Sequence, residues 1–302
     1  MSIHPKKVSV CVMTYNHARF IRQCLQSIVD QKTRYDFEVI VGDDCSTDGT
    51  SSIVQEFAEK YPDLVRPLIH ATNVGATQNY FAIHHAAQGE YIAHVDGDDY
   101  LLPDKLQTQS DLLDAHPSLT ICWHRMEMFN EKGMRRPHPV ENAPYMGRIF
   151  TVKELLLFGP FGPHSSMMYR RDRRVLRTSP EDIIDWQISV EIIGDGQGLM
   201  LRDVLGCYRL HPGGMSTGAT ANQKTRMLIA QAQIRFMKRF PQHKSAIALR
   251  ALFVTLMDAV KLKGYFTKSL RVLLAGRTFP DLTKAGQLIE FYRYSKLPPE
   301  FK

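Results

Sequence analysis

The first 125 residues alternate short apolar runs with stretches of helical periodicity. The apolar runs are rich in β-branched and aromatic residues and have the length of strands. They lie at residues 8–13, 37–41, 65–69, 91–95 and 119–123. Four segments of helical length lie between them, at residues 20–30, 50–61, 76–87 and 103–116. This alternation predicts a mainly parallel sheet with right-handed crossovers and helices on its faces.

The pattern changes twice farther along the chain. Residues 126–221 have a less regular periodicity, whereas the pattern after residue 221 is helical again. It predicts helices at residues 223–239, 245–261, 267–275 and 284–294. We therefore expect one α/β domain over residues 1–221, with a first half at 1–125, followed by a helical region over residues 222–302.

The composition is that of a globular chain. Hydrophobic residues make up 44% and charged residues 23% of 302 residues, which excludes disordered and collagen-like classes. The longest apolar stretch contains Arg250 and Asp258, so it predicts no membrane-spanning helix. The N-terminal segment lacks the apolar core of a signal peptide, which predicts a cytoplasmic location. Five scattered cysteines without a CxxC pair argue against a disulfide framework and a structural zinc site.

The net charge of +7 is unevenly distributed. Residues 223–302 contain 16 Lys and Arg against 4 Asp and Glu, a balance of +12, which leaves −5 for the preceding residues. Such a basic region indicates an anionic partner, for example a membrane surface, although solvated helix faces would give the same count. The region has few interleaved aromatic residues and no recognised nucleic-acid-binding module, which argues against nucleic acid as the partner.

Polar residues gather where the predicted strands end, the edge at which parallel sheets bind their ligands. The first strand is followed by Thr14, Tyr15 and Asn16, the second by Asp43 and Asp44, the third by Asn73 and Gly75, and the fourth by Asp96, Asp98 and Asp99. Either Asp43 or Asp44 is placed to accept a hydrogen bond from a nucleobase, while Ser46 or Asp48 is expected to cap the next helix. The chain contains neither GxxxxGK[ST] nor GxGxxG, so a cation would have to neutralise phosphates bound here.

The segment Asp96-Gly97-Asp98-Asp99 is the strongest of these signals. Three carboxylates in four residues repel one another unless a cation or water compensates their charge. A divalent ion held by one or two carboxylates and by substrate phosphates is the usual arrangement. The alternative is an acidic turn that caps the following helix, although one aspartate would suffice for that.

Two further candidates come from later segments. Asp185 falls in the first turn of a helical pattern, where the helix dipole favours the ionised carboxylate that a general base requires. The alternative is that it only complements the dipole. His211 lies beside a Gly-Gly turn, where it is either a metal ligand or an ordinary polar loop residue.

Together these residues resemble family 2 glycosyltransferases of the GT-A fold. The resemblance is carried, in this order, by VSVCVMTYNHARF, FEVIVGDDCSTDGT, NVGATQNYFAIHHAAQGEYIAHVDGDDYLLPDKL and DWQISVEIIGDGQGLMLRDVLGCYRLHPGGMS. It implies a Rossmann-like, mainly parallel sheet flanked by helices, with a nucleotide-sugar-binding half at residues 1–125 and an acceptor half at residues 126–221. It also implies inverting transfer of a sugar from a nucleotide diphosphate sugar to a hydroxyl in O-antigen-like or capsule-like polysaccharide or glycolipid synthesis.

The resemblance further implies roles for individual residues. The residues expected to contact the nucleotide are Thr14, Tyr15, Asn16, Asp44, Asn73, Gly75 and Asp96, of which Asp44 would bind the base and Asp96 would face the ribose. Asp98 and His211 would bind Mg²⁺ or Mn²⁺, and Asp185 would be the general base, although Asp182 can be aligned there instead. Gln78 stands where many relatives have an arginine, which leaves the diphosphate contacts of that loop open.

The expected partners are a nucleotide diphosphate sugar, a glycan or lipid-linked acceptor and, through the basic helices, the anionic inner face of the cell membrane. In the middle region, His164, Ser165, Ser166 and the arginines within residues 170–174 are candidates to meet an acceptor or a phosphate. A catalytically idle sugar-nucleotide-binding or scaffold protein is the alternative class. The presence of both Asp98 and Asp185 argues against it.

Overall fold

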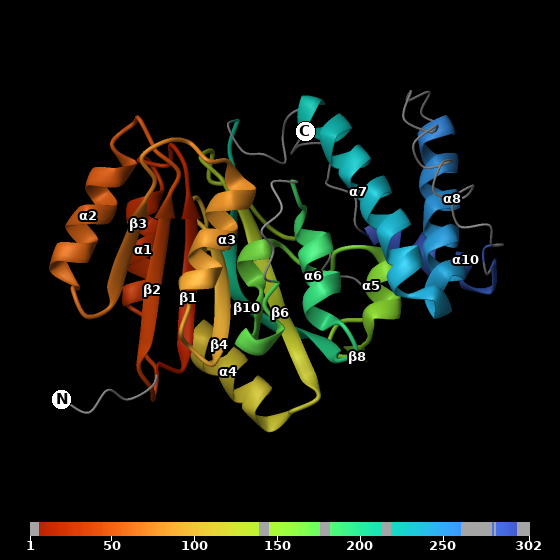
Figure 1. Cartoon of the computed structure of the whole chain (residues 1–302), viewed down its shortest axis with the longest axis horizontal. Coiled ribbons are helices and arrows are strands. Elements are labelled where there is room, and N and C mark those ends of the chain that lie inside the picture. Colours follow the sequence, from red (N-terminus) through yellow and green to blue (C-terminus); the bar gives the residue numbers. More distant parts are fainter. Residues whose placement is uncertain are drawn as a thin grey trace.

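A computed structural model describes residues 6–138, 145–175, 182–212, 219–260, 280 and 282–294. Its strands are β1 Val8–Thr14, β2 Phe37–Asp43, β3 Val65–Ile69, β4 Tyr91–Asp96, β5 Tyr100–Leu101, β6 Leu119–Asn130, β7 Arg135–Pro137, β8 Ile149–Phe150, β9 Met168–Arg170 and β10 Gln197–Leu210. Its helices are α1 Ile21–Val29, α2 Thr50–Lys60, α3 Ala76–Ala86, α4 Lys105–Ala115, α5 Val152–Phe158, α6 Asp185–Ile193, α7 Ala219–Arg239, α8 Lys244–Val260 and α10 Ala285–Tyr294. The main sheet has the order β3-β2-β1-β4-β9-β6-β10-β5, with β7 paired to β6 and β8 to β10. Figure 1 shows β2, β1 and β4 in this order beside the helices.

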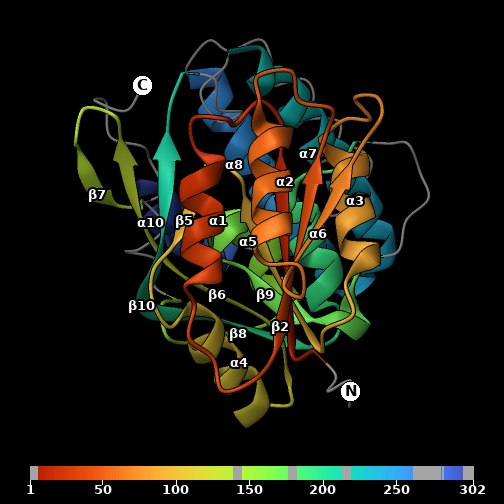
Figure 2. The ribbon, with the colours of Figure 1, turned by 90° about the vertical axis from the view of Figure 1, so that its left-hand side faces the viewer.

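Two apolar cores form on opposite faces of this sheet because side chains alternate along each strand. Val10 and Val12 of β1 face a core that includes buried residues of α1, α2 and α4. Cys11, between them, faces the other core, which includes residues of α3, α5 and α6. The result is a three-layer arrangement, and Figure 2 shows helices on both sides of the strands.

The five strands and four helices predicted in the first 125 residues are confirmed, with ends that differ by one or two residues in most cases. The prediction missed β9, which pairs antiparallel with both β4 and β6 and makes the sheet mixed. It also missed β10, whose alternation is interrupted near Arg202 and Asp203, where its register with β6 shifts. The helix predicted at residues 267–275 lies outside the described residues.

The reversed direction of β9 decides which residues reach the ligand edge. The parallel strands β1, β2 and β4 end at this edge, and β6 and β10 run in the same direction. An antiparallel strand begins where its parallel neighbours end. The short 3₁₀ helix His164–Ser166, just before β9, therefore lies at the ligand edge, whereas Arg170 lies at the opposite edge, paired with Tyr91 at the start of β4.

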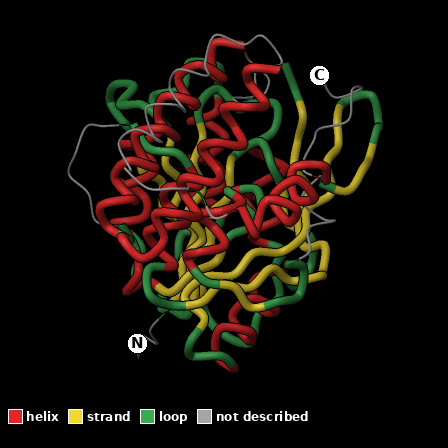
Figure 3. Tube along the Cα trace, turned by 90° about the vertical axis from the view of Figure 1, so that its right-hand side faces the viewer, coloured by secondary structure: helices red, strands yellow, loops and turns green. Residues whose placement is uncertain are grey.

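The C-terminal helices pack against α5 and α6 instead of standing apart. Phe236 of α7, Ile247 and Leu249 of α8 and Leu288 of α10 are buried in the same core as Trp186 of α6. Figure 3 views this end of the molecule and shows the helices lying over the strands. Among the described residues, no helix has the length and apolar character that crossing a membrane requires.

Candidate active site

Gly97 lets the loop after β4 approach the end of β1. Its amide donates a hydrogen bond to the carbonyl of Met13 at 2.8 Å. A Cβ at this position would lie 2.8 Å from the side chain of Thr14 and 3.1 Å from Nδ1 of His17. Any larger residue would therefore push the Asp96–Asp98 segment away from the β1 end, which explains the glycine between the two aspartates.

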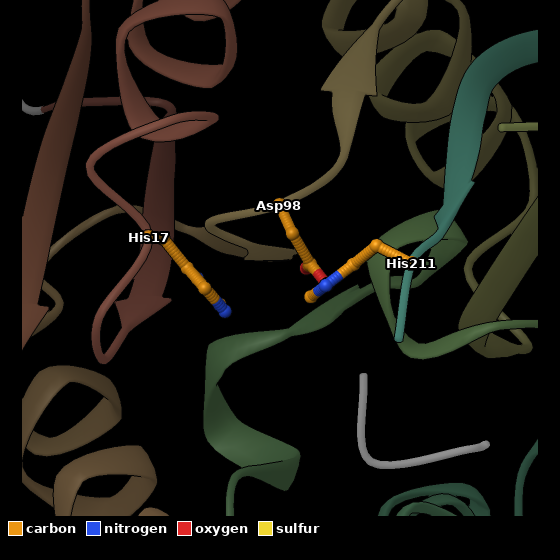
Figure 4. Close-up of side chains that lie close together, drawn as sticks. All are labelled: His17, Asp98 and His211. Atoms are coloured by element: carbon orange, nitrogen blue, oxygen red, sulfur yellow. The ribbon is translucent and has the colours of Figure 1, made fainter. Parts of the chain in front are cut away.

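Asp98 and His211 come together as the sequence predicts. Nε2 of His211 lies 3.0 Å from Oδ2 of Asp98, since the loop after β4 and the end of β10 meet at the same edge. Burial opposes ionisation of Asp98, but the His211 hydrogen bond and the nearby His17 bring its pKa below the ordinary value. His17, from the loop after β1, points toward this pair (Figure 4), and one ligand atom from each of the three residues lies within 4.8 Å of the others.

These residues fit a divalent cation. An ionised carboxylate beside an imidazole is a suitable donor set, and burial lowers the pKa of His17, which keeps its ring neutral and able to ligate. Nδ1 of His17 is also buried without a hydrogen-bond partner among the described residues.

Asp99 supports the site instead of taking part in it. Its carboxylate accepts hydrogen bonds from Oγ of Ser165 at 2.6 Å and from the amide of Arg209 at 2.8 Å. The guanidinium of Arg209 donates in turn to the carbonyl of Asp98 at 2.8 Å. Burial, together with the adjacent carboxylates, raises the pKa of Asp99 well above its ordinary value. Asp99 thus ties β10 and the segment before β9 to the Asp98 loop.

Asp44 orders the loop after β3. Its two carboxylate oxygens accept hydrogen bonds from the amides of Val74 at 2.7 Å and Gly75 at 3.0 Å, and Asn73 donates to its carbonyl at 3.2 Å. Gly75 has a φ of 86°, a conformation that favours glycine. Asp44, Asn73 and Gly75 are therefore brought together as one unit at the ligand edge, where the carboxylate retains lone pairs for a ligand.

The other polar residues after β1 and β2 hold these loops together. The N-cap of α2 is Gly49, so the expectation that Ser46 or Asp48 fills that position is wrong. Asp48 instead accepts hydrogen bonds from the amides of Thr50 at 3.1 Å and Ala18 at 3.0 Å. Ser46, the other candidate, donates to the buried Asp43 and accepts from the amide of Asn16. Tyr15, next to Asn16, is 45% exposed.

A chain of buried rings ends on Asp96. The Tyr169 hydroxyl lies 2.6 Å from Nδ1 of His84, Nε2 of His84 lies 3.0 Å from Nδ1 of His94, and Nε2 of His94 lies 3.1 Å from Oδ1 of Asp96. Burial raises the pKa of Asp96 to about 7, although nearby His164 opposes the shift. These contacts fix the Asp96 carboxylate at the end of β4.

Asp185 begins α6 at this edge, and its side chain is 62% exposed. Its Oδ1 lies 3.5 Å from Nδ1 of His164. Asp182, the alternative base, lies one turn earlier and accepts a hydrogen bond from the Thr77 hydroxyl at 3.3 Å. The two carboxylates therefore have different surroundings: Asp185 faces the buried rings behind Asp96, and Asp182 contacts the start of α3.

The expectation that arginines 170–174 meet an acceptor or phosphate is wrong for the two whose side chains are turned inward. Arg170 donates to the carbonyls of Leu119 and Leu113 at the far edge of the sheet, because β9 carries it away from the site. Arg174 donates to three carbonyls at the end of α3, including that of Ala87. By contrast, His164 and Ser165 do lie beside Asp96 and Asp185.

Sequence reasoning missed His17 and the buried histidines 84 and 94. His17 directly follows the Thr14-Tyr15-Asn16 segment at a strand end, so position along the chain could have suggested it. No local signal marks His84 and His94, because they come together only when α3 packs on the sheet.

The comparisons with known proteins agree with this architecture. The glycosyl transferase family 2 model matches residues 9–175, more than half of the chain. An uncharacterized protein of Mycobacterium bovis is 34% identical over 224 residues, which cover 72% of this chain and 62% of that protein. The poly(ribitol-phosphate) beta-N-acetylglucosaminyltransferase TarS of Staphylococcus aureus is 34% identical over 140 residues, 46% of this chain and 24% of TarS.

Solved structures show the same fold at lower sequence identity. The crystal structure of residues 1–349 of S. aureus TarS has a TM-score of 0.64 and 20% identity, covering 96% of this chain and 90% of that one. The mannosyltransferase PcManGT from Pyrobaculum calidifontis, in complex with GDP-Man and Mn²⁺, has a TM-score of 0.58 and 19% identity, covering 99% and 84%. The fold is that of GT-A glycosyltransferases. The chain belongs to glycosyl transferase family 2.

Proposed function

We propose that this chain transfers a sugar, with inversion, from a nucleotide diphosphate sugar to an acceptor hydroxyl in polysaccharide or glycolipid synthesis. The observation that carries the proposal is the gathering of the Asp98–His211 pair, Asp96 and Asp185 at one sheet edge. Family membership supports it, as do the complexes of TarS with UDP-GlcNAc and of PcManGT with GDP-Man and Mn²⁺.

The nucleotide would bind in the loops after β1, β2 and β3. Thr14, Tyr15 and Asn16 would line one side, and the unit of Asp44, Asn73 and Gly75 the other. Asp44 would bind the base through the lone pairs that the Val74 and Gly75 amides leave free. Asp96, held by His94, would face the ribose.

Asp98 and His211 would hold Mg²⁺ or Mn²⁺ next to the diphosphate. A divalent cation bound there supplies positive charge beside the leaving nucleoside diphosphate. The chain has no glycine-rich phosphate loop that could provide this charge stabilisation through a helix N-terminus.

Asp185 would take the proton from the acceptor hydroxyl as that oxygen attacks the anomeric carbon. Its exposure at the start of α6 leaves it accessible to an acceptor. A single displacement inverts the anomeric centre. Asp182 is the alternative base, and the variants described below distinguish the two.

We also propose that residues 222–302 bring the catalytic domain of residues 1–221 to the cytoplasmic face of an anionic membrane, where a lipid-linked acceptor would lie. The apolar side chains of these helices are only partly used for packing. Those of Met227, Leu256, Leu282 and Ile289 are exposed. Exposed apolar side chains among basic residues suit the surface of an anionic bilayer.

The test of the proposed activity is a screen of UDP-, GDP- and dTDP-sugars with Mn²⁺, in which release of the nucleoside diphosphate is measured. We expect turnover of at least one donor by the wild-type protein. Binding of a nucleotide sugar without any turnover, with and without candidate acceptors, would instead favour the idle binding protein.

A further inference from the structure

The metal site has a third side chain that the resemblance to known glycosyltransferases does not supply. We propose that His17 is a ligand of the cation together with Asp98 and His211, and that this donor set selects Mn²⁺ over Mg²⁺. This inference rests on the proposed metal site at Asp98. It adds a residue from the loop after β1 and a reason for metal preference.

The first support is convergence from three separate segments. His17 follows β1, Asp98 follows β4 and His211 follows β10, and their ligand atoms lie within 4.8 Å of one another. Figure 4 shows the His17 ring directed toward the Asp98–His211 pair. The buried Nδ1 of His17 has no hydrogen-bond partner among the described residues. No hydrogen bond at this nitrogen would therefore have to break for it to bind a cation.

The second support is the orientation of the rings. The planes of His17 and His211 are inclined at 86°, with centroids 6.2 Å apart. Lone pairs of imidazole lie in the ring plane, so steeply inclined rings from opposite sides can direct them at one point between the rings.

A second group, His94, Asp96 and His164, provides the contrast. Its ligand atoms are also close together, but the two rings are stacked at 3.8 Å with planes only 24° apart. Lone pairs of such rings run side by side and do not converge on one ion. Both nitrogens of His94 are also in hydrogen-bonding contact, with His84 and Asp96. The geometry therefore points to the His17 group as the cation site and to the His94 group as a hydrogen-bonded support.

The chemical types of the three ligand side chains explain the proposed preference for Mn²⁺ over Mg²⁺. Mg²⁺ prefers oxygen ligands and retains its waters, whereas imidazole nitrogens suit first-row transition ions. Two imidazoles and one carboxylate would favour Mn²⁺ over Mg²⁺ even before a nucleotide is present. The bound ion would also join the loop of Tyr15 and Asn16 to the end of β10, which would order the nucleotide site.

The test measures metal binding by the full-length protein without nucleotide. Free Mn²⁺ is followed by electron paramagnetic resonance, and Mg²⁺ is added as a competitor. The variant His17→Phe keeps an aromatic ring next to Phe20 but removes the nitrogens, and His116→Ala changes an exposed histidine away from the site. We expect His17→Phe to weaken Mn²⁺ binding by more than about tenfold and to reduce the preference over Mg²⁺, while His116→Ala matches the wild type.

Spin-echo spectra of the bound Mn²⁺ count the coordinating nitrogens, and the ¹⁴N modulation should decrease in His17→Phe. Equal Mn²⁺ affinity and equal ¹⁴N modulation in wild type and His17→Phe would overturn the inference. If Asp98→Asn nevertheless abolishes binding in that case, the metal site of the proposed function stands and only the role of His17 fails. If neither variant changes Mn²⁺ binding, the metal site itself is wrongly assigned.

Discussion

Nδ1 of His164 lies 3.5 Å from Oδ1 of Asp185, at the point where the buried rings meet the exposed start of α6. The other nitrogen, Nε2, is buried without a hydrogen-bond partner among the described residues. Burial, followed by the effect of His94, lowers the pKa of His164 to about 4, so the ring is neutral at pH 7. A proton on Nδ1 then faces the carboxylate, whereas a proton on Nε2 would leave a buried donor unsatisfied. His164 is therefore placed to orient Asp185.

We expect His164→Phe to lower kcat by about tenfold or more, since it removes the ring nitrogen that lies 3.5 Å from the carboxylate of the proposed base and orients it. KM for the donor sugar should change less than kcat, because His164 reaches the proposed ribose contact Asp96 only through the stacked ring of His94. His164→Gln, whose amide can donate, should recover part of the loss. Equal kcat in wild type and both variants, measured under saturating substrate, would show that His164 does not act on the base.

The identity of the base is tested by Asp185→Asn and Asp182→Asn. Asp185→Asn should reduce turnover by about two to four orders of magnitude, because an amide cannot accept the acceptor proton. Binding of the nucleoside diphosphate with Mn²⁺, measured by calorimetry, should be retained. The reverse pattern, with the large loss in Asp182→Asn, would assign the base to the residue that contacts Thr77. Unfolding of Asp185→Asn would instead indicate a purely structural role in the helix.

The buried histidines should reduce stability between pH 7 and pH 5, in opposition to Asp96, whose pKa is raised to about 7 by burial and whose protonation favours the folded state. The pKa of His164 is about 4 and that of His94 about 3 in the folded protein, against about 6.5 when unfolded. At these two histidines the unfolded state therefore binds more protons below pH 6.5, and their contribution to the free energy of unfolding decreases as the pH falls. For His164 the decrease by pH 5 is about 2 kcal/mol. Urea unfolding at both pH values should show a smaller decrease in His164→Gln, and an equal decrease would contradict the assignment.

Variants of two leucines of α8 distinguish a role of this helix in membrane contact from a role in packing. Leu249 is buried in the core shared with α6, whereas Leu256 is 55% exposed. Leu256→Ser should weaken co-sedimentation with anionic vesicles at low salt and leave the melting temperature unchanged. Leu249→Ala should lower the free energy of unfolding by about 2–5 kcal/mol. Absence of binding to anionic and neutral vesicles by the wild-type protein would leave these helices with a packing role alone.

The sequence predicted the elements whose periodicity is local. Val8–Thr14 and Ile21–Val29 have regular apolar spacing, so their prediction required no tertiary information. The three-residue β9 has too few positions for a period, and its reversed direction follows only from pairing with β4 and β6. This explains both the misplacement of Arg170 and the arrival of Ser165 beside Asp99.

The residues of the candidate site also fall into those that the sequence marks and those that only tertiary packing brings together. Asp98 and His211 were predictable because a dense carboxylate cluster and a motif mark them. The ring chain from Tyr169 to Asp96 was not predictable, since each histidine taken alone is an ordinary residue of a helix or strand. Its contacts depend on the packing of α3 on the sheet, which brings His84 to His94 of β4 and to Tyr169 of β9.

The most direct test of the central claim is turnover of a nucleotide sugar by wild type and Asp98→Ala, with and without EDTA. We expect EDTA to abolish release of the nucleoside diphosphate and added Mn²⁺ to restore it. We expect Asp98→Ala to be inactive although it melts at the wild-type temperature. Full activity of the wild-type protein in EDTA, or full activity of Asp98→Ala, would contradict metal-dependent sugar transfer at this site.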